Sequence, residues 1–253
     1  MKLLHKVAII TGASRSIGAA IAKRYALEGA KVVINDRAYP GLAERVVTDI
    51  QASGGEAFAF QADVSNESEV QDMVNETARR FGTVDILVNN AAIDPRVPWH
   101  EISSEDWDEV MGVNVRSQFL CSKAVFPYMK ANHYGKIINV SSVTYFTGQP
   151  GFVHYVASKG AIVGFTRALA REIGKHGVNV NCITPGAVLT ETEQEKVNPD
   201  DMPRVEKMLA EAQCFARRET AADLEGAFVF LASADSDFIT GQTLNVDGGW
   251  IMH

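Results

Sequence analysis

The chain has 253 residues, 46% of them hydrophobic and 22% charged, which fits one compact domain over residues 1–253 and argues against a second. Its formal net charge of −7 argues against nucleic acid or an anionic membrane as a partner, since an acidic surface repels both. No apolar run approaches the roughly 20 residues that span a bilayer, and the N-terminus leads into a strand rather than a cleavable signal, so a cytoplasmic protein is expected.

In the first third of the chain, short apolar runs alternate with amphipathic ones. Continuous Val, Ile and Leu runs predict buried strands, and apolar residues at helical spacing, closed by glycine, predict the helices between them. Ser65 is expected to cap the third helix, whose inner face carries Met73. The expected elements are strands over 6–10, 31–35, 57–62 and 85–88, and helices over 17–28, over 42–52 and after residue 65.

The same alternation continues to the C-terminus. A long helix is expected from Ser103 or Ser104 past Asn114, with a bend near Pro127. The charged segment over residues 190–218 is irregular and is expected to form a substrate loop. The other expected elements are strands over 136–140, 178–183 and 243–246, and helices through residue 155, over 203–213 and over 221–232. This order predicts an α/β fold, a single doubly wound domain with a seven-stranded parallel sheet and helices on both faces.

The three cysteines indicate neither a disulfide framework nor a metal site. Cys121, Cys182 and Cys214 are odd in number and far apart in the sequence, a pattern typical of free buried thiols. We therefore expect no bound metal and assign these side chains no function.

The first strand runs through a turn containing glycine, Thr11–Gly18, directly into a helix. Small residues there let the backbone approach a pyrophosphate, whose charge is met by amide groups at the helix N-terminus. Asp36 ends the second strand, where a carboxylate accepts hydrogen bonds from a ribose diol. The expected dinucleotide site consists of Gly12, Ser14, Arg15, Ser16, Ile17, Gly18, Asp36 and Arg37.

A second group of polar residues follows the strand over 136–140. Tyr155 and Lys159 are four residues apart on the expected helix, so the ammonium group lies beside the phenol and is expected to lower its pKa. A phenol tuned in this way can act as a general acid or base. The hydroxyl of Ser142 is expected to hydrogen-bond the substrate oxygen. These residues indicate proton transfer at an alcohol or a carbonyl group.

Further short motifs accompany these residues along nearly the whole chain. They are Asp63–Val64, Asn89–Ala92, Asn114, Pro185–Gly186 with Thr190, and Gly241–Gly249. Together with the glycine turn and the Ser142, Tyr155 and Lys159 set, they resemble the short-chain dehydrogenase/reductase family. The resemblance implies a Rossmann-like fold and an oxidoreductase in which Tyr155 is the acid/base, Ser142 polarises the substrate oxygen and Lys159 tunes the phenol and holds the nicotinamide ribose.

The resemblance also implies roles that spacing alone does not assign. Asn114 would anchor a water molecule in a proton relay to Lys159. The cofactor would be held by Asp63 and Val64 beside the adenine, by Asn89 and Ala91 along the cleft, and by Val188 and Thr190 at the carboxamide, next to Pro185 and Gly186. A homotetramer is implied as well, in which the apolar C-terminal end and the long helices near Asn114 and Tyr155 are buried between subunits.

Two positions depart from the family pattern. Ser16 stands where family members usually carry glycine, and its Cβ is expected to crowd the cofactor cleft mildly. Ala92 also replaces a commoner glycine, which we expect to be tolerated. The favoured cofactor is NAD because Asp36 repels a 2′-phosphate, but NADP stays open because Arg15 and Arg37 are close enough in sequence to bind that phosphate.

Loop residues are expected to select a small-molecule substrate. The candidates are Asp94, Arg96, Gln149, His154 and Glu191. His154 is equally expected to serve packing or the subunit surface, and Arg96 to be a solvated loop charge. The polar character of these residues favours a sugar, a polyol or a similar secondary alcohol. The alternatives are a reductase of 3-oxoacyl thioesters and, more remotely, a nucleotide-binding scaffold without catalysis.

Overall fold

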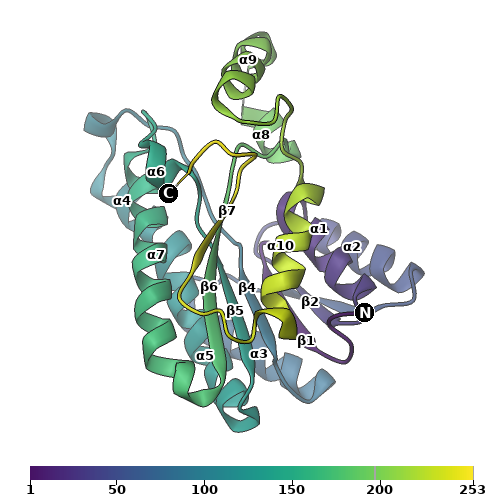
Figure 1. Ribbon diagram of the computed structural model, residues 1–253. Coiled ribbons are helices and arrows are strands. Elements are labelled where there is room, and N and C mark those ends of the chain that lie inside the picture. Colours follow the sequence, from purple (N-terminus) through teal and green to yellow (C-terminus); the bar gives the residue numbers. More distant parts are fainter. Residues whose placement is uncertain (197, 253) are drawn as a thin grey trace.

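A single sheet of seven parallel strands forms the centre of the computed structural model, which describes residues 1–196 and 198–252 (Figure 1). The strands are β1 (Val7–Thr11), β2 (Lys31–Asp36), β3 (Glu56–Gln61), β4 (Ile86–Asn89), β5 (Gly135–Val140), β6 (Val178–Pro185) and β7 (Thr243–Val246). Their order across the sheet is β3-β2-β1-β4-β5-β6-β7. The predicted seven-stranded, Rossmann-like fold is therefore confirmed.

Helices cover both faces of the sheet, as the continuous apolar strands predict (Figure 1). They are α1 (Ser16–Leu27), α2 (Pro40–Ala52), α3 (Glu67–Phe81), α4 (Ser104–Met111), α5 (Ser117–Asn132), α6 (Thr144–Thr147), α7 (Val153–Ile173), α8 (Glu191–Lys196), α9 (Met202–Ala212) and α10 (Ala221–Ala232). One apolar core joins the sheet to α1, α2 and α10, and a second joins it to α3, α5 and α7. No helix in the described ranges is long and apolar enough to cross a membrane.

The carboxyl ends of β1 and β4 open the crevice that positions the site. The strand order reverses between them, since β1 pairs with β2 on one side and β4 on the other. Ligands of open parallel sheets bind at such a switch point. The register aligns the carboxyl ends of neighbouring strands. Thr11 pairs with Asn35 across β1 and β2, and Asn89 pairs with Asn139 across β4 and β5.

The long helix expected to run past Asn114 is interrupted. After α4, Gly112–Arg116 form one π-helical turn that leads into α5. A π turn inserts one extra residue, shifts the face that points inward, and is frequent at functional sites. Asn114 lies in this turn and is fully buried. Periodicity alone predicts a regular helix here, because a single π turn is too short to be recognised from the spacing of apolar residues.

Three expectations about single caps and loops are also wrong. The cap of α3 is Asn66 rather than Ser65, because the Asn66 side chain accepts hydrogen bonds from the N–H groups at the start of the helix. The short helices α6 and α8 form where the sequence predicts only loop. Helices α8 and α9 project above the carboxyl ends of the strands, over the crevice (Figure 1). The segment expected to bind substrate therefore has two helices, of which the sequence predicts one.

Candidate active site

The glycine turn after β1 is shaped by close backbone approaches. Gly12 has φ +61°, and a Cβ there would lie 2.9 Å from the Cα of Ala91. A Cβ on Gly18 would lie 2.4 Å from the carbonyl oxygen of Gly12. Only glycine fits either position without moving backbone. The side-chain amide of Asn90 closes the turn from the other strand, since it donates to the carbonyl oxygens of Thr11 at 2.9 Å and Gly12 at 3.0 Å.

Ser16, at the position where the family pattern has glycine, has a left-handed backbone that favours glycine. Its φ is +53°, in the left-handed region, where a non-glycine residue costs roughly 1 kcal/mol. Its hydroxyl donates to the carboxylate of Glu191 at 2.8 Å. The conformation needed at this turn is therefore retained, and the added side chain is used to contact α8.

Asp36 stands at the end of β2 with both carboxylate oxygens oriented by neighbours. One oxygen accepts a 2.6 Å hydrogen bond from the hydroxyl of Ser14. The other accepts from the backbone N–H groups of Ala38 at 2.8 Å and Tyr39 at 3.0 Å. Ser14, which we expected to contact the cofactor, instead has a buried hydroxyl that fixes Asp36.

The two arginines next to Asp36 are already paired. Arg15 contacts Glu195 with both oxygens 3.0 Å from its Nη1. Arg37 contacts Asp63 at 3.1 Å. Asp36 and Asp63 line the same cleft. This end of the cleft, where the cofactor ribose is expected, therefore combines one carboxylate held by neutral donors with two guanidinium groups that carry their own counter-ions.

The run Asn89–Ala92 is placed differently from the expectation. Asn89 does not line the cleft, because its side chain is buried and donates to the amide oxygen of Asn139 at 2.9 Å. Asn90, Ala91 and Ala92 line it instead. Residues alternate sides along a strand, so the side chain of the last strand residue points inward and that of the next residue is free to reach the cleft.

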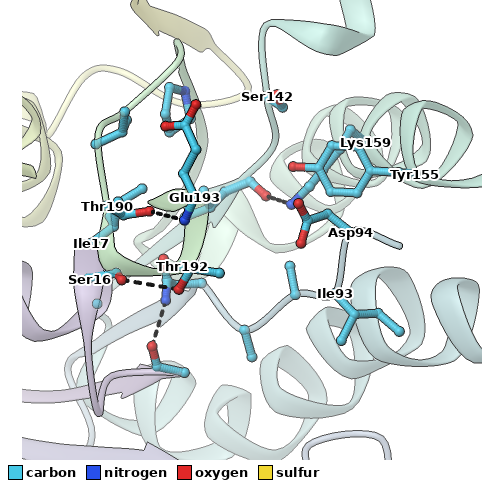
Figure 2. Close-up of a pocket in the computed structure, with 18 of the residues that line it drawn as sticks. Ser16, Ile17, Ile93, Asp94, Ser142, Tyr155, Lys159, Thr190, Thr192 and Glu193 are labelled. Carbon is cyan, nitrogen blue, oxygen red and sulfur yellow. Dashed lines mark hydrogen bonds between the residues drawn. The ribbon is translucent and has the colours of Figure 1, made fainter. Parts of the chain in front are cut away.

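Ser142, Tyr155 and Lys159 converge at the other end of the cleft (Figure 2). Ser141 and Val143 extend β5 past its end, donating backbone hydrogen bonds to β6. The hydroxyl of Ser141 then donates to the carbonyl oxygen of Lys159 at 2.8 Å, which ties the strand end to α7. The Lys159 ammonium donates to the carbonyl oxygen of Val140 at 3.0 Å.

The electrostatics of this pair differ from the expectation. Burial raises the pKa of Tyr155, the nearby Asp94 carboxylate raises it further, and a hydrogen bond with Ser142 lowers it. Burial lowers the pKa of Lys159 to about 8. The prediction that Lys159 brings the phenol pKa down is therefore wrong for the chain alone, because desolvation acts on both groups and favours the neutral form of each.

Asn114 joins the loop after β4 to the helix that carries Tyr155. Its amide oxygen accepts from the N–H of Ile93 at 2.8 Å, and its nitrogen donates to the Ile93 carbonyl at 2.9 Å. The same nitrogen donates to the hydroxyl of Ser158 at 3.0 Å. The side chain of Asn114 thus fixes the position of the neighbouring Asp94 relative to α7. The implied water relay to Lys159 stays a prediction.

The whole cleft has a volume of about 770 Å³. It runs from Asp36 and the glycine turn, past Ala91, to Ser142 and Tyr155. Figure 2 shows Ser16 and Ile17 with Thr190 and Thr192 on one side, and Asp94 with Tyr155 and Lys159 on the other. The expected cofactor residues that line it are Gly12, Arg15, Ser16, Ile17, Gly18, Asp36, Arg37, Asp63, Val64, Ala91, Tyr155, Lys159, Pro185, Gly186, Val188 and Thr190.

A family model described as enoyl-(acyl carrier protein) reductase matches residues 12–251. The chain belongs to the short-chain dehydrogenase/reductase family. As a member of that family it is an oxidoreductase of CH–OH and keto groups that uses a nicotinamide cofactor. The cleft fits such a cofactor, because the two glycines let the backbone of the turn pack closely at the start of α1, where amide groups at the helix N-terminus can meet a pyrophosphate.

Curated relatives of this dehydrogenase/reductase include two bacterial enzymes of one named activity. A 3-oxoacyl-(acyl-carrier-protein) reductase of Synechocystis sp. is 39% identical over 252 residues, covering 99% of this chain and 98% of its own. A protein of Staphylococcus epidermidis with the same name and the designation FabG is 37% identical over 249 residues, covering 98% of this chain and all of its own.

Solved structures of the same fold carry other names. A proposed gluconate dehydrogenase from Agrobacterium tumefaciens superposes with a TM-score of 0.93 at 33% identity, covering 98% of this chain and 97% of its own. A proposed short-chain alcohol dehydrogenase from Sinorhizobium meliloti gives 0.92 at 33% identity over the same shares. The family and the reaction type agree across these proteins, and the substrates in their names differ.

The five residues expected to contact substrate separate into two groups. Asp94, Arg96 and Gln149 line the cleft of this family member. His154 does not, because it is fully buried on the inner side of α7, and neither ring nitrogen has a hydrogen-bond partner within the described residues. Glu191 does not either, because its carboxylate is exposed and accepts from Ser16. The structure therefore does not place these two residues in the lining of the cleft, and a substrate contact by either stays a prediction.

Other lining residues were missed by the sequence reasoning. Phe152 stacks edge-on against Tyr155, with ring centroids 5.7 Å apart, and Arg96 lies over the same Phe152 ring at 5.2 Å. Three apolar residues of α9 face the cleft, and their spacing of three and four residues was a signal that could have been used. Lining residues that were not named as candidates include Glu109, Phe152, Trp250 and, within the expected substrate segment over 190–218, Thr192, Glu193, Val205, Met208 and Leu209.

Proposed function

We propose that the protein oxidises a small polyhydroxylated or similarly polar secondary alcohol with NAD, and reduces the matching ketone. The observation that carries the proposal is the polar lining around the catalytic phenol. Asp94, close enough to Tyr155 to raise its pKa, lines the cleft with Gln149 and Arg96. A substrate with several hydroxyl groups needs such partners, because each hydroxyl left unpaired on desolvation costs about 1–3 kcal/mol.

The residues support a division of roles. A bound nicotinamide would supply the acceptor for the hydride of the alcohol carbon and, in reverse, the hydride for the ketone carbon. Tyr155 would take the alcohol proton during oxidation and give it back during reduction, and the Ser142 hydroxyl would hold the reacting oxygen. Lys159, which lines the cleft with little exposure and donates a hydrogen bond to the Val140 carbonyl oxygen, would hold the ribose next to the nicotinamide. Hydride and proton together balance the two-electron change.

NAD is favoured over NADP on the geometry of the ribose end. The Asp36 carboxylate already accepts three hydrogen bonds and presents negative charge where a 2′-phosphate would lie. Arg15 and Arg37 each contact another carboxylate. Replacement of Asp36 by Ala should shift the ratio of kcat/KM values towards NADP. A higher kcat/KM with NADP than with NAD in the native protein would reject this part of the proposal.

A second candidate is the reduction of 3-oxoacyl thioesters. The names of the Synechocystis and Staphylococcus relatives favour it. So does the apolar wall of α9, where Val205, Met208 and Leu209 face the cleft and are suited to an acyl chain. Against it, a substrate carried by another protein requires a basic docking surface, whereas Asp94, Glu109 and Glu193 outnumber Arg96 and Lys159 among the charged side chains that line this end.

One panel of substrates separates the two candidates. Purified protein is assayed for NADH formation with sugars, polyols and alicyclic alcohols, and for NADH and NADPH consumption with 3-oxoacyl thioesters of short and long chain. The proposal expects a polar alcohol to have the highest kcat/KM. If long-chain thioesters are turned over best and every polyol is inert, the second candidate replaces the first.

A further inference from the structure

Helix α8 lies over the glycine turn and contacts it at two points. The hydroxyl of Ser16 donates to Glu191 at 2.8 Å, and the guanidinium group of Arg15 contacts both oxygens of Glu195 at 3.0 Å. Both acidic residues come from the segment expected to bind substrate, and both partners come from the turn expected to bind cofactor. The two halves of the cleft are therefore joined by side-chain contacts that span 175 and 180 residues of sequence.

Arg15 is also the cation next to the ribose end. Its guanidinium carbon lies 4.7 Å from the centre of the Tyr39 ring. The backbone N–H of Tyr39 donates to Asp36 at 3.0 Å, so Arg15, Tyr39 and Asp36 form one wall of the cleft. An arginine in this place matches a 2′-phosphate in charge and geometry. The positive charge of Arg15 is therefore available to a 2′-phosphate only when Glu195 is not paired with it.

The second arginine of this wall has a different kind of partner. Arg37 contacts Asp63 at 3.1 Å, and both residues follow neighbouring strands, β2 and β3, of the rigid sheet. Its counter-ion is independent of α8. Glu195 is 60% exposed and belongs to the short helix over the cleft, while Arg15 is 26% exposed. Of these two ion pairs, only the Arg15–Glu195 pair joins a positive charge beside the expected cofactor site to the segment expected to bind substrate.

We propose that Glu195 is a specificity-determining residue for the cofactor. By neutralising Arg15 from the substrate segment, it removes the cation that a 2′-phosphate would use, and so adds to the exclusion exerted by Asp36. This inference rests on the proposed use of NAD. It predicts that cofactor choice is set partly by a residue some 180 positions away from the glycine turn in sequence.

The test measures cofactor binding directly, without substrate turnover. Dissociation constants for NADH and NADPH are obtained by fluorescence titration of the full chain. Glu195→Gln should lower the Kd for NADPH about fivefold, the size of an exposed ion-pair interaction, and change the Kd for NADH less than about twofold. The gain should shrink at high ionic strength, because the attraction between the freed Arg15 and the phosphate is screened.

Two further variants assign the effect to the Arg15 pair. Glu206→Gln removes the same charge from an exposed position on α9 and should leave both constants unchanged. In an Arg15→Gln background, Glu195→Gln should no longer favour NADPH, since the cation that it frees is gone. Equal shifts for both cofactors, no shift, or an unchanged gain in the Arg15→Gln background would each overturn the proposal. Failure of the native protein to bind NADH or NADPH would instead refute the proposed function.

Discussion

The Nζ atom of Lys159 lies 5.3 Å from the centre of the Tyr155 ring. The same ammonium donates to the carbonyl oxygen of Val140, so its position is fixed by the end of β5 as well as by α7. Burial lowers the pKa of Lys159 and raises that of Tyr155. The protonation state of this phenol therefore depends first on its burial and then on the Asp94 carboxylate in the cleft, and both effects can be measured.

Removal of the phenolic hydroxyl should stop turnover and leave cofactor binding intact. Tyr155→Phe keeps the ring, which packs against Phe152 at 5.7 Å between centroids, and deletes only the group that carries the proton. We expect kcat to fall at least about a thousandfold, within the range known for general acid/base groups, while the Kd for NADH changes less than about twofold. Tyr145→Phe, on the partly exposed α6, is the matched control and should keep activity. A Tyr155→Phe enzyme with native kcat would exclude the mechanism.

Neutralisation of Asp94 should move the pH profile of alcohol oxidation. The Asp94 carboxylate raises the pKa of Tyr155, so Asp94→Asn lowers that pKa and lets the phenolate form at lower pH. The rising limb of kcat/KM for oxidation should shift to lower pH in the variant. Glu172→Gln, at the far exposed end of α7, should leave the limb in place. A shift to higher pH, or an equal shift in both variants, would contradict the electrostatic role of Asp94.

The sequence was sufficient to predict the sheet, because seven apolar strands between helices have few other arrangements. It was also sufficient to place Tyr155 and Lys159 one turn apart on the same helix. It could not place side chains whose direction depends on tertiary contacts. His154 neighbours Tyr155 in sequence, yet a step of one residue on a helix turns it by about 100° into the core. Asn114 likewise faces inward because of a π turn that periodicity does not reveal.

Gln149, which lines the cleft, and His154, which is buried in the core, should give different phenotypes when replaced. Gln149 lines the cleft, so Gln149→Leu should raise KM for a hydroxylated substrate several-fold with a smaller change in kcat, as when ground-state and transition-state contacts are lost together. His154 is buried without a hydrogen-bond partner within the described residues, so His154→Leu removes an unpaired polar group and should leave KM unchanged and Tm equal or higher. A raised KM in His154→Leu at native Tm would restore His154 as a substrate contact.

A homotetramer is the assembly that we propose from the family resemblance. Apolar side chains on α4, α5 and the C-terminal segment remain exposed in the single chain, among them Trp107 at 39%, Phe119 at 50% and Met252 at 78%. Where such side chains form one contiguous patch, it is usually covered by other protein. Light scattering should give four times the chain mass of 27.5 kDa. Phe119→Glu should lower the assembly state, whereas Leu27→Glu, on the exposed side of α1, should not. A monomer mass for the native protein would refute the proposal.

Glu219 should make the protein less stable as the pH rises. Its side chain is 5% exposed, and burial raises its pKa by more than the backbone N–H of Gly186 and the charge of Arg217 lower it. Burial raises its pKa to about 8, and the charges of Asp223 and Asp247 act in the same direction. In the unfolded chain a glutamate loses its proton near pH 4.3. Between about pH 4.3 and about 8 the folded state therefore holds a proton that the unfolded state has released, and the free energy of unfolding falls as pH increases.

Glu219→Gln removes this titration, so the Tm of the variant minus that of the native protein should grow between about pH 5 and 8 and level off above. Glu211→Gln, on the exposed side of α9, should show a Tm difference that does not change with pH.

Hydrogen exchange can show where in the structure the ionisation of Glu219 acts. The carbonyl oxygen of Glu219 accepts a 2.8 Å hydrogen bond from the N–H of Leu189, next to the cleft residues Val188 and Thr190. Ionisation of Glu219 should loosen this pairing, so the protection of the Leu189 amide against hydrogen exchange, corrected for the intrinsic pH dependence, should decrease above about pH 8 in the native protein and not in Glu219→Gln. If the Tm difference is independent of pH, Glu219 is ionised in the folded state and its carboxylate has a partner in solution.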